Sequence, residues 1–227
     1  CGDTASELKY LVRDASRVEP GTKVVAVTAP TQLMLTAERT ALNLLCHLSG
    51  VATATAQWVD AIAGTTAIIR DTRKTTPGLR ALEKYAVRCG GGQNHRMSLS
   101  DAALVKDNHI VAAGGVAEAF EKVRALATTL PIEIEVDTLD QLAVAIQAGA
   151  DVVLLDNMAP AVMSEAVLIA QRHEAATGHA VLLEASGGLT LSNAKDVAAT
   201  GVHFISVGGL THSSPILDVG LDLQTII

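Results

Sequence analysis

Six short runs rich in β-branched and aliphatic residues recur after Gly64, and stretches with helical spacing separate them. The runs cover residues 66–72, 103–107, 132–136, 152–156, 180–186 and 203–209. Alternation of strands with helices predicts repeated β-α units, which build a parallel sheet or a barrel. Most runs are continuously apolar, which is typical of strands buried on both faces. The expected fold class is therefore α/β.

Chain length limits the size of this barrel. A complete eight-unit barrel needs about 250 residues, whereas about 160 follow Gly64 in this chain of 227. We therefore expect an incomplete α/β barrel of six or seven strands over residues 65–227.

Residues 1–64 have a different pattern and predict a separate, smaller α/β domain. A strand is expected at residues 23–29, after the turn signal Glu19-Pro20-Gly21. Apolar residues at helical spacing predict a helix over residues 30–64. Glycines at positions 50 and 64 predict a break and a stop in that helix.

Basic residues are concentrated in one fifth of an acidic chain. Residues 65–110 hold eight of the 17 lysines and arginines against four acids, a net charge of +4, while the whole chain carries −7. Such concentration suits a small anionic ligand in a cleft. The negative total argues against a nucleic-acid surface, and an aromatic content of 2% argues against a base-stacking platform.

Other sequence features argue against membrane and disulfide classes. No run approaches the 18 or so apolar residues of a transmembrane helix, and no signal-peptide pattern is present. The cysteines, Cys1, Cys46 and Cys89, contain no Cys-x-x-Cys pair and indicate neither a disulfide framework nor a zinc site. A reducing, cytoplasmic location is the resulting expectation.

Each run ends in polar or charged residues, and α/β barrels place their chemistry at the carboxyl ends of the strands. Five candidates for binding an anion lie in this basic region: Arg73, Lys74, His95, Arg96 and Lys106. The planar fork of arginine suits a carboxylate, and lysine acts as a compact charge against phosphate. By contrast, Arg80, Lys84 and Arg88 recur every four residues and predict a solvated helix face.

Two glycine-containing turns predict a phosphate site. Ser186-Gly187-Gly188 follows one run and precedes a helix expected at residues 190–200, and Ser206 to Gly209, which includes Gly208, repeats the arrangement. Glycines let backbone N–H groups approach a phosphate, and a helix N-terminus favours an anion. An ordinary tight turn is the alternative for each.

Glu135 and Asp156 end consecutive runs. Carboxylates there can accept hydrogen bonds from sugar hydroxyls or hold Mg²⁺ that also bridges phosphates. The alternative is that such acids cap the following helices. We favour that alternative for Glu133 and Asp137.

Five motifs, taken together and in order, resemble the quinolinate phosphoribosyltransferase family. They are ERTALNLLCHLSGVAT (38–53), DTRKTTPGLRALEKYAVRCGGGQNHR (71–96), ALVKDNH (103–109), LLDN (154–157) and EASGGLT (184–190). The resemblance runs from about Glu38 to Leu223. It implies an amino-terminal open sandwich, a seven-strand incomplete barrel and at least a dimer. Family chains carry several dozen residues before the position of Cys1, so the smaller domain is expected to be incomplete at its start.

The resemblance also implies a reaction. Quinolinate and phosphoribosyl pyrophosphate give nicotinate mononucleotide, pyrophosphate and CO₂, with Mg²⁺, in de novo NAD biosynthesis. Position by position, the residues that resemble the quinolinate pocket are Arg73, His95, Arg96 and Lys106. Those that resemble the phosphoribosyl pyrophosphate side are Lys74, Glu135, Asp156, Ser186, Gly187, Gly188 and Gly208. Catalytic roles are expected for Lys74, Lys106, Glu135 and Asp156. Arg39 resembles an arginine that reaches into the neighbouring subunit's site of a homodimer or larger oligomer.

Three other functions stay open. A paralogue associated with molybdenum transport shares much of this motif pattern. Lys106 at a strand end suits a Schiff-base aldolase, because a lysine amine can act as a nucleophile. A noncatalytic anion-binding or assembly domain would use the same loops without turnover.

Overall fold

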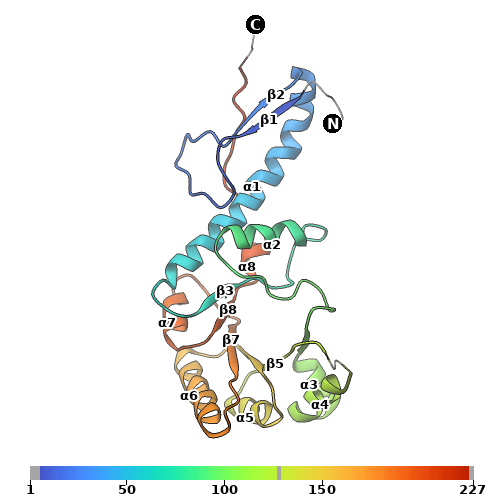
Figure 1. Cartoon of the computed structure of the whole chain (residues 1–227), viewed down its shortest axis with the longest axis vertical. Helices are drawn as coiled ribbons and strands as arrows, with labels where there is room; N and C mark the ends of the chain where they lie inside the picture. Colours follow the sequence, from blue (N-terminus) through green and yellow to red (C-terminus); the bar gives the residue numbers. More distant parts are fainter. Residues whose placement is uncertain (1–5, 127–128, 225–227) are drawn as a thin grey trace.

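Six parallel strands form the main sheet (Figure 1) of a computed structural model that describes residues 6–126 and 129–224. The strands are β3 (Ile68–Arg70), β4 (Ala103–Val105), β5 (Ile132–Val136), β6 (Val152–Asp156), β7 (Leu182–Ser186) and β8 (Phe204–Ser206). Each lies within one of the six apolar runs, so the predicted α/β class and parallel sheet are confirmed.

The strand order is that of a barrel left open on one side. It runs β3-β8-β7-β6-β5-β4, so β3 and β4, which are neighbours in the chain, form the two edges. Beside β3, Gln93 makes one parallel bridge to Arg70, and its N–H donates to the Ile69 carbonyl at 2.8 Å. Within the described residues, this short segment takes the place of a seventh strand.

Helices follow the strands and cover the sheet: α2 (Arg80–Cys89), α3 (Asp107–Ala113), α4 (Val116–Leu126), α5 (Leu139–Gln147), α6 (Pro160–Thr177), α7 (Ala194–Ala199) and α8 (Gly209–His212). Strands and helices share one apolar core that includes the fully buried Ile134, Leu155 and Leu183. Removal of such surface from water is the main term that stabilises a fold. Local signals set helix ends: the Thr138 side chain caps α5, and Gly178 ends α6 in the left-handed conformation.

The amino-terminal part consists of a small antiparallel sheet beside a long helix (Figure 1). The sheet pairs β1 (Glu7–Tyr10) with β2 (Val25–Thr28), and α1 (Thr31–Ala61) runs from this sheet down to the barrel. The strand expected at residues 23–29 is confirmed as β2, whereas β1 was not predicted. Because α1 contacts both parts, the domain division at residue 64 stays a prediction.

Gly50 does not break α1, contrary to the prediction from its sequence position. A Cβ at this position would overlap the carbonyl oxygen of Pro215. Nearby, the Leu217 N–H donates to the Cys46 carbonyl at 3.0 Å. The glycine thus lets the carboxyl-terminal segment lie against the helix, which then continues to Ala61.

Two composition-based expectations can be compared with the structure. Cys46 and Cys89 are free thiols, and Cys1 lies outside the described residues. In the part of the chain that the structure describes, every helix is too short or too polar to cross a membrane.

Candidate active site at the carboxyl ends of the strands

The carboxyl ends of four neighbouring strands lie level with one another. Arg70 on β3 is in register with Ser206 on β8. Ser206 is in register with Ser186 on β7, which is in register with Asp156 on β6. The loops that follow these residues therefore leave the sheet at one rim, where barrels place their functional groups.

The loops after β7 and β8 form what we call the glycine side (Ser186–Gly188 and Gly208). At Gly187, φ is +82°, and a Cβ would overlap the Asn157 side chain. The Asn157 N–H donates to the Ser186 carbonyl at 2.9 Å. Positive φ and close approach together require glycine, so the side chain and backbone of Asn157 pack directly against the Gly187 backbone.

The helix expected at residues 190–200 is shorter than predicted, because α7 begins at Ala194. Before it, the Asn193 side chain accepts the Thr190 N–H at 2.9 Å and closes a turn. Gly187 and Gly188 therefore stand well ahead of the helix, and the loop offers an anion its own N–H groups rather than the end of α7.

Lys74 lies over the glycine side. A Cβ on Gly208 would lie 3.2 Å from Lys74 Cδ. The Lys74 backbone is held from two directions: its N–H donates to Thr72 Oγ1 at 3.0 Å, and its carbonyl accepts from Thr211 Oγ1 at 2.7 Å. Thr211, on α8, is buried. A compact cation beside glycine loops suits a phosphate group.

Arg73, His95 and Arg96 form what we call the basic side, which extends from the loop after β3 into the barrel. There His95 and Arg96 line a cavity together with Ile132 and Val152, at the amino-terminal ends of β5 and β6. Burial and the charge of Arg73 lower the pKa of the Arg96 guanidinium, and Glu133 opposes this shift. Arg96 Nη1 donates to the Ala102 carbonyl at 2.8 Å. Arg73 Nε is buried and has no hydrogen-bond partner among residues 6–126 and 129–224. Two interacting guanidinium groups can bind carboxylates through parallel hydrogen bonds.

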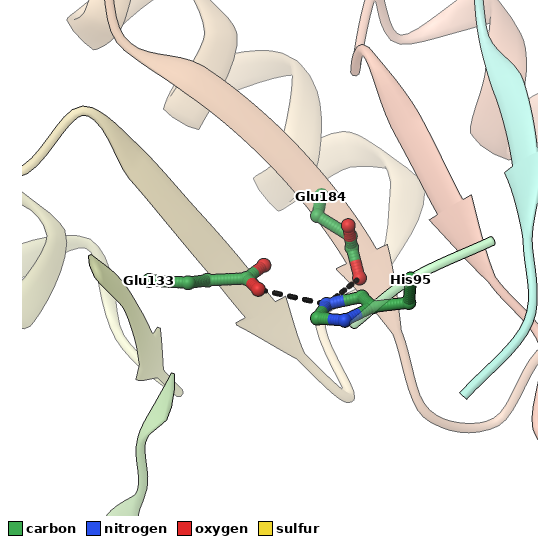
Figure 2. A group of neighbouring side chains, drawn as sticks. All are labelled: His95, Glu133 and Glu184. Atoms are coloured by element: carbon green, nitrogen blue, oxygen red, sulfur yellow. Dashed lines mark hydrogen bonds and ion pairs between the residues drawn. The ribbon is translucent and has the colours of Figure 1, made fainter. Parts of the chain in front are cut away.

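His95 points its ring between two buried carboxylates (Figure 2). Its Nε2 lies 2.8 Å from Glu133 Oε2 and 3.5 Å from Glu184 Oε1. Its Nδ1 accepts the Arg96 N–H at 2.7 Å. Both ring nitrogens thus have partners within the protein, and the ring supports the Arg96 backbone. A direct contact between His95 and a ligand stays a prediction.

Glu184 is a fully buried carboxylate in the middle of β7. Ser206 Oγ donates to its Oε1, and Arg70 Nη1 donates to its Oε2 at 2.8 Å. Burial and the charge of Glu133 raise the pKa of Glu184. The signal for this interior position was present in the sequence, since an acid interrupts an otherwise apolar run.

The predicted helix-capping role of Glu133 is wrong. Its side chain is buried and faces His95 inside the barrel, because alternate residues of β5 point inward and Glu133 is one of them. The predicted helix-capping role is also wrong for Asp137, since the neighbouring Thr138 caps α5.

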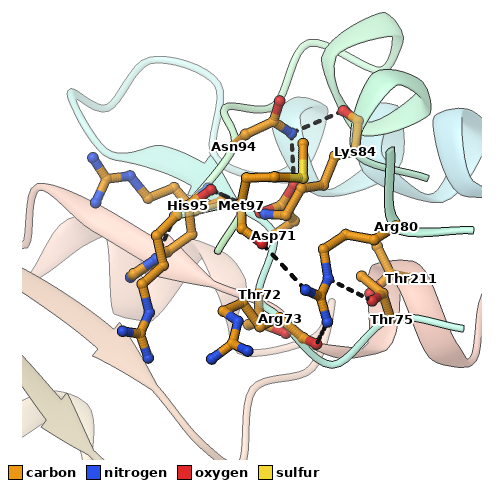
Figure 3. Close-up of polar contacts among 12 residues, drawn as sticks. Asp71, Thr72, Arg73, Thr75, Arg80, Lys84, Asn94, His95, Met97 and Thr211 are labelled. Atoms are coloured by element: carbon orange, nitrogen blue, oxygen red, sulfur yellow. Dashed lines mark hydrogen bonds and ion pairs between the residues drawn. The ribbon is translucent and has the colours of Figure 1, made fainter. Parts of the chain in front are cut away.

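Lys84 is fully buried, so the predicted solvated helix face is wrong at this position. Its ammonium group donates to Asp71 Oδ1 and, at 3.0 Å, to the His95 carbonyl. Asp71 also accepts the His95 N–H at 2.8 Å and Asn94 Nδ2 at 2.6 Å (Figure 3). Burial lowers the pKa of Lys84, and the hydrogen bond to Asp71 opposes that shift. Periodicity placed Lys84 on a helix face but could not show that residues 94–96 cover it.

The other two basic residues of α2 differ from each other. Arg80 donates from Nε to Thr75 Oγ1 at 3.0 Å and from Nη1 to the Met97 carbonyl at 3.2 Å, so it holds loops together (Figure 3). Arg88 is exposed, as predicted, and stacks over the ring of Tyr85.

Lys106 and Glu135 form an ion pair at the end of β4 and β5, with 2.9 Å between Nζ and Oε2. Glu135 is in register with Leu154, two residues before Asp156, so both acids point to the same face of the sheet. Asp156 Oδ2 accepts from Asn157 Nδ2 at 2.8 Å. Carboxylates are the type of ligand that Mg²⁺ takes, together with water and phosphates, and Mg²⁺ binding by Glu135 and Asp156 stays a prediction.

The comparisons with known proteins agree with this geometry. Residues 51–222 match the model of the quinolinate phosphoribosyl transferase C-terminal domain, and residues 4–49 match that of the N-terminal domain. The chain belongs to the quinolinate phosphoribosyl transferase family. The two matches meet inside α1, and the resemblance seen in the sequence motifs is confirmed.

Relatives within the quinolinate phosphoribosyl transferase family are longer than this chain. A nicotinate-nucleotide pyrophosphorylase [carboxylating] of Mycobacterium leprae is 54% identical over 94% of this chain and 74% of its own length. The Homo sapiens protein of that name is 40% identical, with 96% and 73% covered. The nicotinate-nucleotide pyrophosphorylase structure from Ehrlichia chaffeensis superposes with a TM-score of 0.91 and 36% identity, covering 97% of this chain and 78% of that one.

Arg39 is the predicted site residue that lies apart from the others. It is in the first third of α1, the part beside the small sheet (Figure 1), with 73% of its side chain exposed. Its ion pair is with its neighbour Glu38, at 3.8 Å. Within one chain, therefore, the rim of the barrel is built without Arg39.

Proposed function

We propose that this chain transfers the phosphoribosyl group of phosphoribosyl pyrophosphate to quinolinate, giving nicotinate mononucleotide, pyrophosphate and CO₂. The observation that carries this proposal is the presence, in one barrel of the quinolinate phosphoribosyl transferase fold, of both the basic side and the glycine side. A dianion and a sugar phosphate need these two kinds of surface. The carboxylating names of the relatives favour this reaction over a molybdenum-transport role and over an aldolase.

The basic side is suited to quinolinate, which carries two carboxylates. Desolvating two negative charges is costly unless cations replace the lost water. Arg73 and Arg96 supply two guanidinium groups, and Lys106, which directly follows β4, adds a third positive charge. Lys106 reaches the substrate by exchanging its partner Glu135 for a carboxylate of quinolinate.

The glycine side is suited to phosphoribosyl pyrophosphate. Backbone N–H groups of Gly187 and Gly188 bind the 5′-phosphate, and Lys74 neutralises the departing pyrophosphate. Glu135 and Asp156 bind the ribose hydroxyls. The same two carboxylates are the proposed ligands of Mg²⁺, which, when bound, stabilises negative charge on pyrophosphate.

The chemistry needs positioning more than it needs a protein base. The pyridine nitrogen attacks the anomeric carbon while the bond to pyrophosphate breaks, through an oxocarbenium-like transition state by analogy with glycosyl transfer. The ring then carries a positive charge at nitrogen. When the adjacent carboxylate leaves as CO₂, the ring carbon keeps the electron pair of the broken bond and takes a proton from water.

We also propose that the active unit is a homodimer or larger, in which Arg39 enters the neighbouring subunit's site. Its exposure and distance from the rim support this reading. Mixing inactive Arg39→Ala chains with inactive Lys106→Ala chains tests it. Partial recovery of activity is expected, and no recovery would contradict a shared site.

A cytoplasmic location remains a proposal from the cysteine pattern.

The reaction itself is tested by stoichiometry. Pyrophosphate and CO₂ should be released in equal amounts, and only when both substrates are present. Release of neither product would leave a binding or assembly domain as the better function. Borohydride reduction in the presence of a carbonyl substrate should trap no adduct on Lys106, whereas a trapped adduct would favour an aldolase.

A further inference from the structure

Asp71 and Lys84 form a buried charged pair that the reaction proposed above does not use. Both side chains are fully buried. Asp71 follows β3, and Lys84 lies in the middle of α2, so the pair joins two elements that are separate in the chain. A buried ion pair contributes little net stability compared with apolar residues of similar size. Its presence therefore calls for another explanation.

The pair holds the segment that carries His95 and Arg96. Asp71 Oδ1 accepts the His95 N–H at 2.8 Å, and Lys84 Nζ donates to the His95 carbonyl at 3.0 Å (Figure 3). The Asn94 amide is fixed as well, since it donates to Asp71 Oδ2 at 2.6 Å and to the Lys84 carbonyl at 2.8 Å. Residues 94–96 belong to no helix or strand, so these contacts set their path.

Asp71 is also tied to the second arginine of the basic side. Arg73 follows it by two residues, in a loop that likewise belongs to no helix or strand. One buried carboxylate thus stands at the start of the loop that carries Arg73 and binds the segment that carries Arg96, while Arg80 Nη2 donates to the Arg73 carbonyl at 3.4 Å.

Lys74, on the glycine side, has a different anchor. Its carbonyl accepts from Thr211 on α8 at 2.7 Å, and its N–H donates to Thr72 at 3.0 Å. The two sides of the rim are therefore held by separate sets of contacts, although Arg73 and Lys74 are adjacent in the chain.

We infer that Asp71 and Lys84 are positioning residues for the diacid substrate, because their paired, buried contacts set the separation of Arg73 and Arg96. This inference rests on the proposed function. The opposite charges offset each other, so the pair supports the two arginines without presenting a carboxylate that would compete with the substrate. Misplacing a binding group by about 1 Å is enough to cost up to about 100-fold in rate.

Two variants test the inference. Asp71→Asn keeps the size of the side chain but leaves the Lys84 ammonium unpaired and places an amide against Asn94. The double variant Asp71→Asn/Lys84→Met removes both charges, and it keeps the test possible if the single variant does not fold. Each folded variant is assayed for the KM of quinolinate and of phosphoribosyl pyrophosphate, and for quinolinate binding in the absence of turnover.

The expected result is a rise of at least about tenfold in the quinolinate KM and Kd, with the KM of phosphoribosyl pyrophosphate changed less than about twofold. Unchanged quinolinate binding, or equal losses for both substrates in a folded variant, would overturn the inference. If wild-type protein itself releases no pyrophosphate and CO₂, the proposed function fails. If wild-type protein is active and the variants keep its KM and Kd values, only the inference about Asp71 and Lys84 fails.

Glu83→Gln is the matched control. Glu83 is the neighbour of Lys84 on α2 and is also fully buried, but its carboxylate binds His47 at 2.8 Å and the Thr76 N–H at 3.0 Å, and no residue of the segment 94–96. The ratio of its two KM values should stay within about twofold of wild type. The same selective loss in Glu83→Gln would show that any change of buried charge on α2 suffices, and would overturn the assignment to Asp71 and Lys84.

Discussion

The basic side and the glycine side are built in opposite ways. On the basic side, irregular segments are held by buried side chains: Asp71 and Lys84 bind the backbone of His95, and the His95 ring binds the Arg96 N–H. On the glycine side, Gly187 has no side chain where it meets Asn157 of the neighbouring loop, and the groups proposed to bind an anion are backbone N–H groups. The difference matches the ligands proposed for the two sides, because a planar fork suits a carboxylate and N–H groups suit a phosphate.

The largest expected effect comes from removing the fork on the basic side. Arg96→Ala should raise the quinolinate KM and lower kcat/KM about 100- to 1000-fold, because each hydrogen bond to a charged group contributes about 1.5–3 kcal/mol. The constants for phosphoribosyl pyrophosphate should barely change. Steady-state kinetics with each substrate varied in turn provide the measurement. Arg96→Lys is the control, since it keeps the charge and loses the fork. Equal loss for both substrates would break the distinction between the two sides.

The next effect is expected at the glycine side and should have the reverse selectivity. Gly187→Ala places a methyl group against Asn157 at a φ of +82° and should lower kcat/KM for phosphoribosyl pyrophosphate by about tenfold or more. Gly188→Ala is the matched control: φ is also positive, at +61°, but its Cβ would lie 3.7 Å from Asn157, an ordinary contact. Both substitutions cost about 1–2 kcal/mol in backbone conformation. Equal effects of the two on kinetics would rule out close approach as the reason for glycine at 187.

A smaller effect is expected at the anchor of Lys74. Thr211→Val keeps the shape of a buried side chain and removes the hydrogen bond to the Lys74 carbonyl. Losing a neutral hydrogen bond costs about 1 kcal/mol, so kcat/KM for phosphoribosyl pyrophosphate should fall about fivefold. Quinolinate binding, measured without turnover, should stay within about twofold. A selective loss of quinolinate binding would contradict separate anchoring of the two sides.

The smallest effect concerns stability and the buried acid beneath the basic side. The pKa of Glu184 is raised by burial and by Glu133, so the folded state holds its proton more tightly than the unfolded state does. Its stabilising contribution is therefore fully present below the ordinary value of 4.5 and is lost as pH rises through the folded-state pKa. The Glu184→Gln variant has no ionisable group at this position. The difference between its free energy of unfolding and that of wild type, variant minus wild type, should therefore increase as pH rises.

Urea unfolding of both proteins between about pH 5 and about pH 8 measures this difference. The difference should increase with pH whatever its value at the acid end, where the lost contacts to Arg70 and Ser206 affect the variant alone. A difference that is flat or that decreases with pH would contradict the raised pKa.

Much of the fold could be predicted because its signals are local. Six apolar runs predicted six strands, and β5 and β6 have the predicted bounds. Motifs in fixed order predicted the family. Two errors share one cause: Gly50 and Lys84 were interpreted from their own segments, whereas Pro215 lies against the first and residues 94–96 cover the second.

The sequence by itself determined the α/β alternation and the gathering of cations, because periodicity and composition are properties of neighbouring positions. Only the tertiary structure decided which cations keep a donor without a protein partner in the described chain and which are buried in ion pairs. Arg73 and Lys84 are both basic residues of the same region of the sequence. In the structure, Arg73 keeps a buried donor that has no protein partner in the described chain, whereas Lys84 is paired with Asp71. That choice depends on which segments pack together, and packing brings together residues that no local pattern relates.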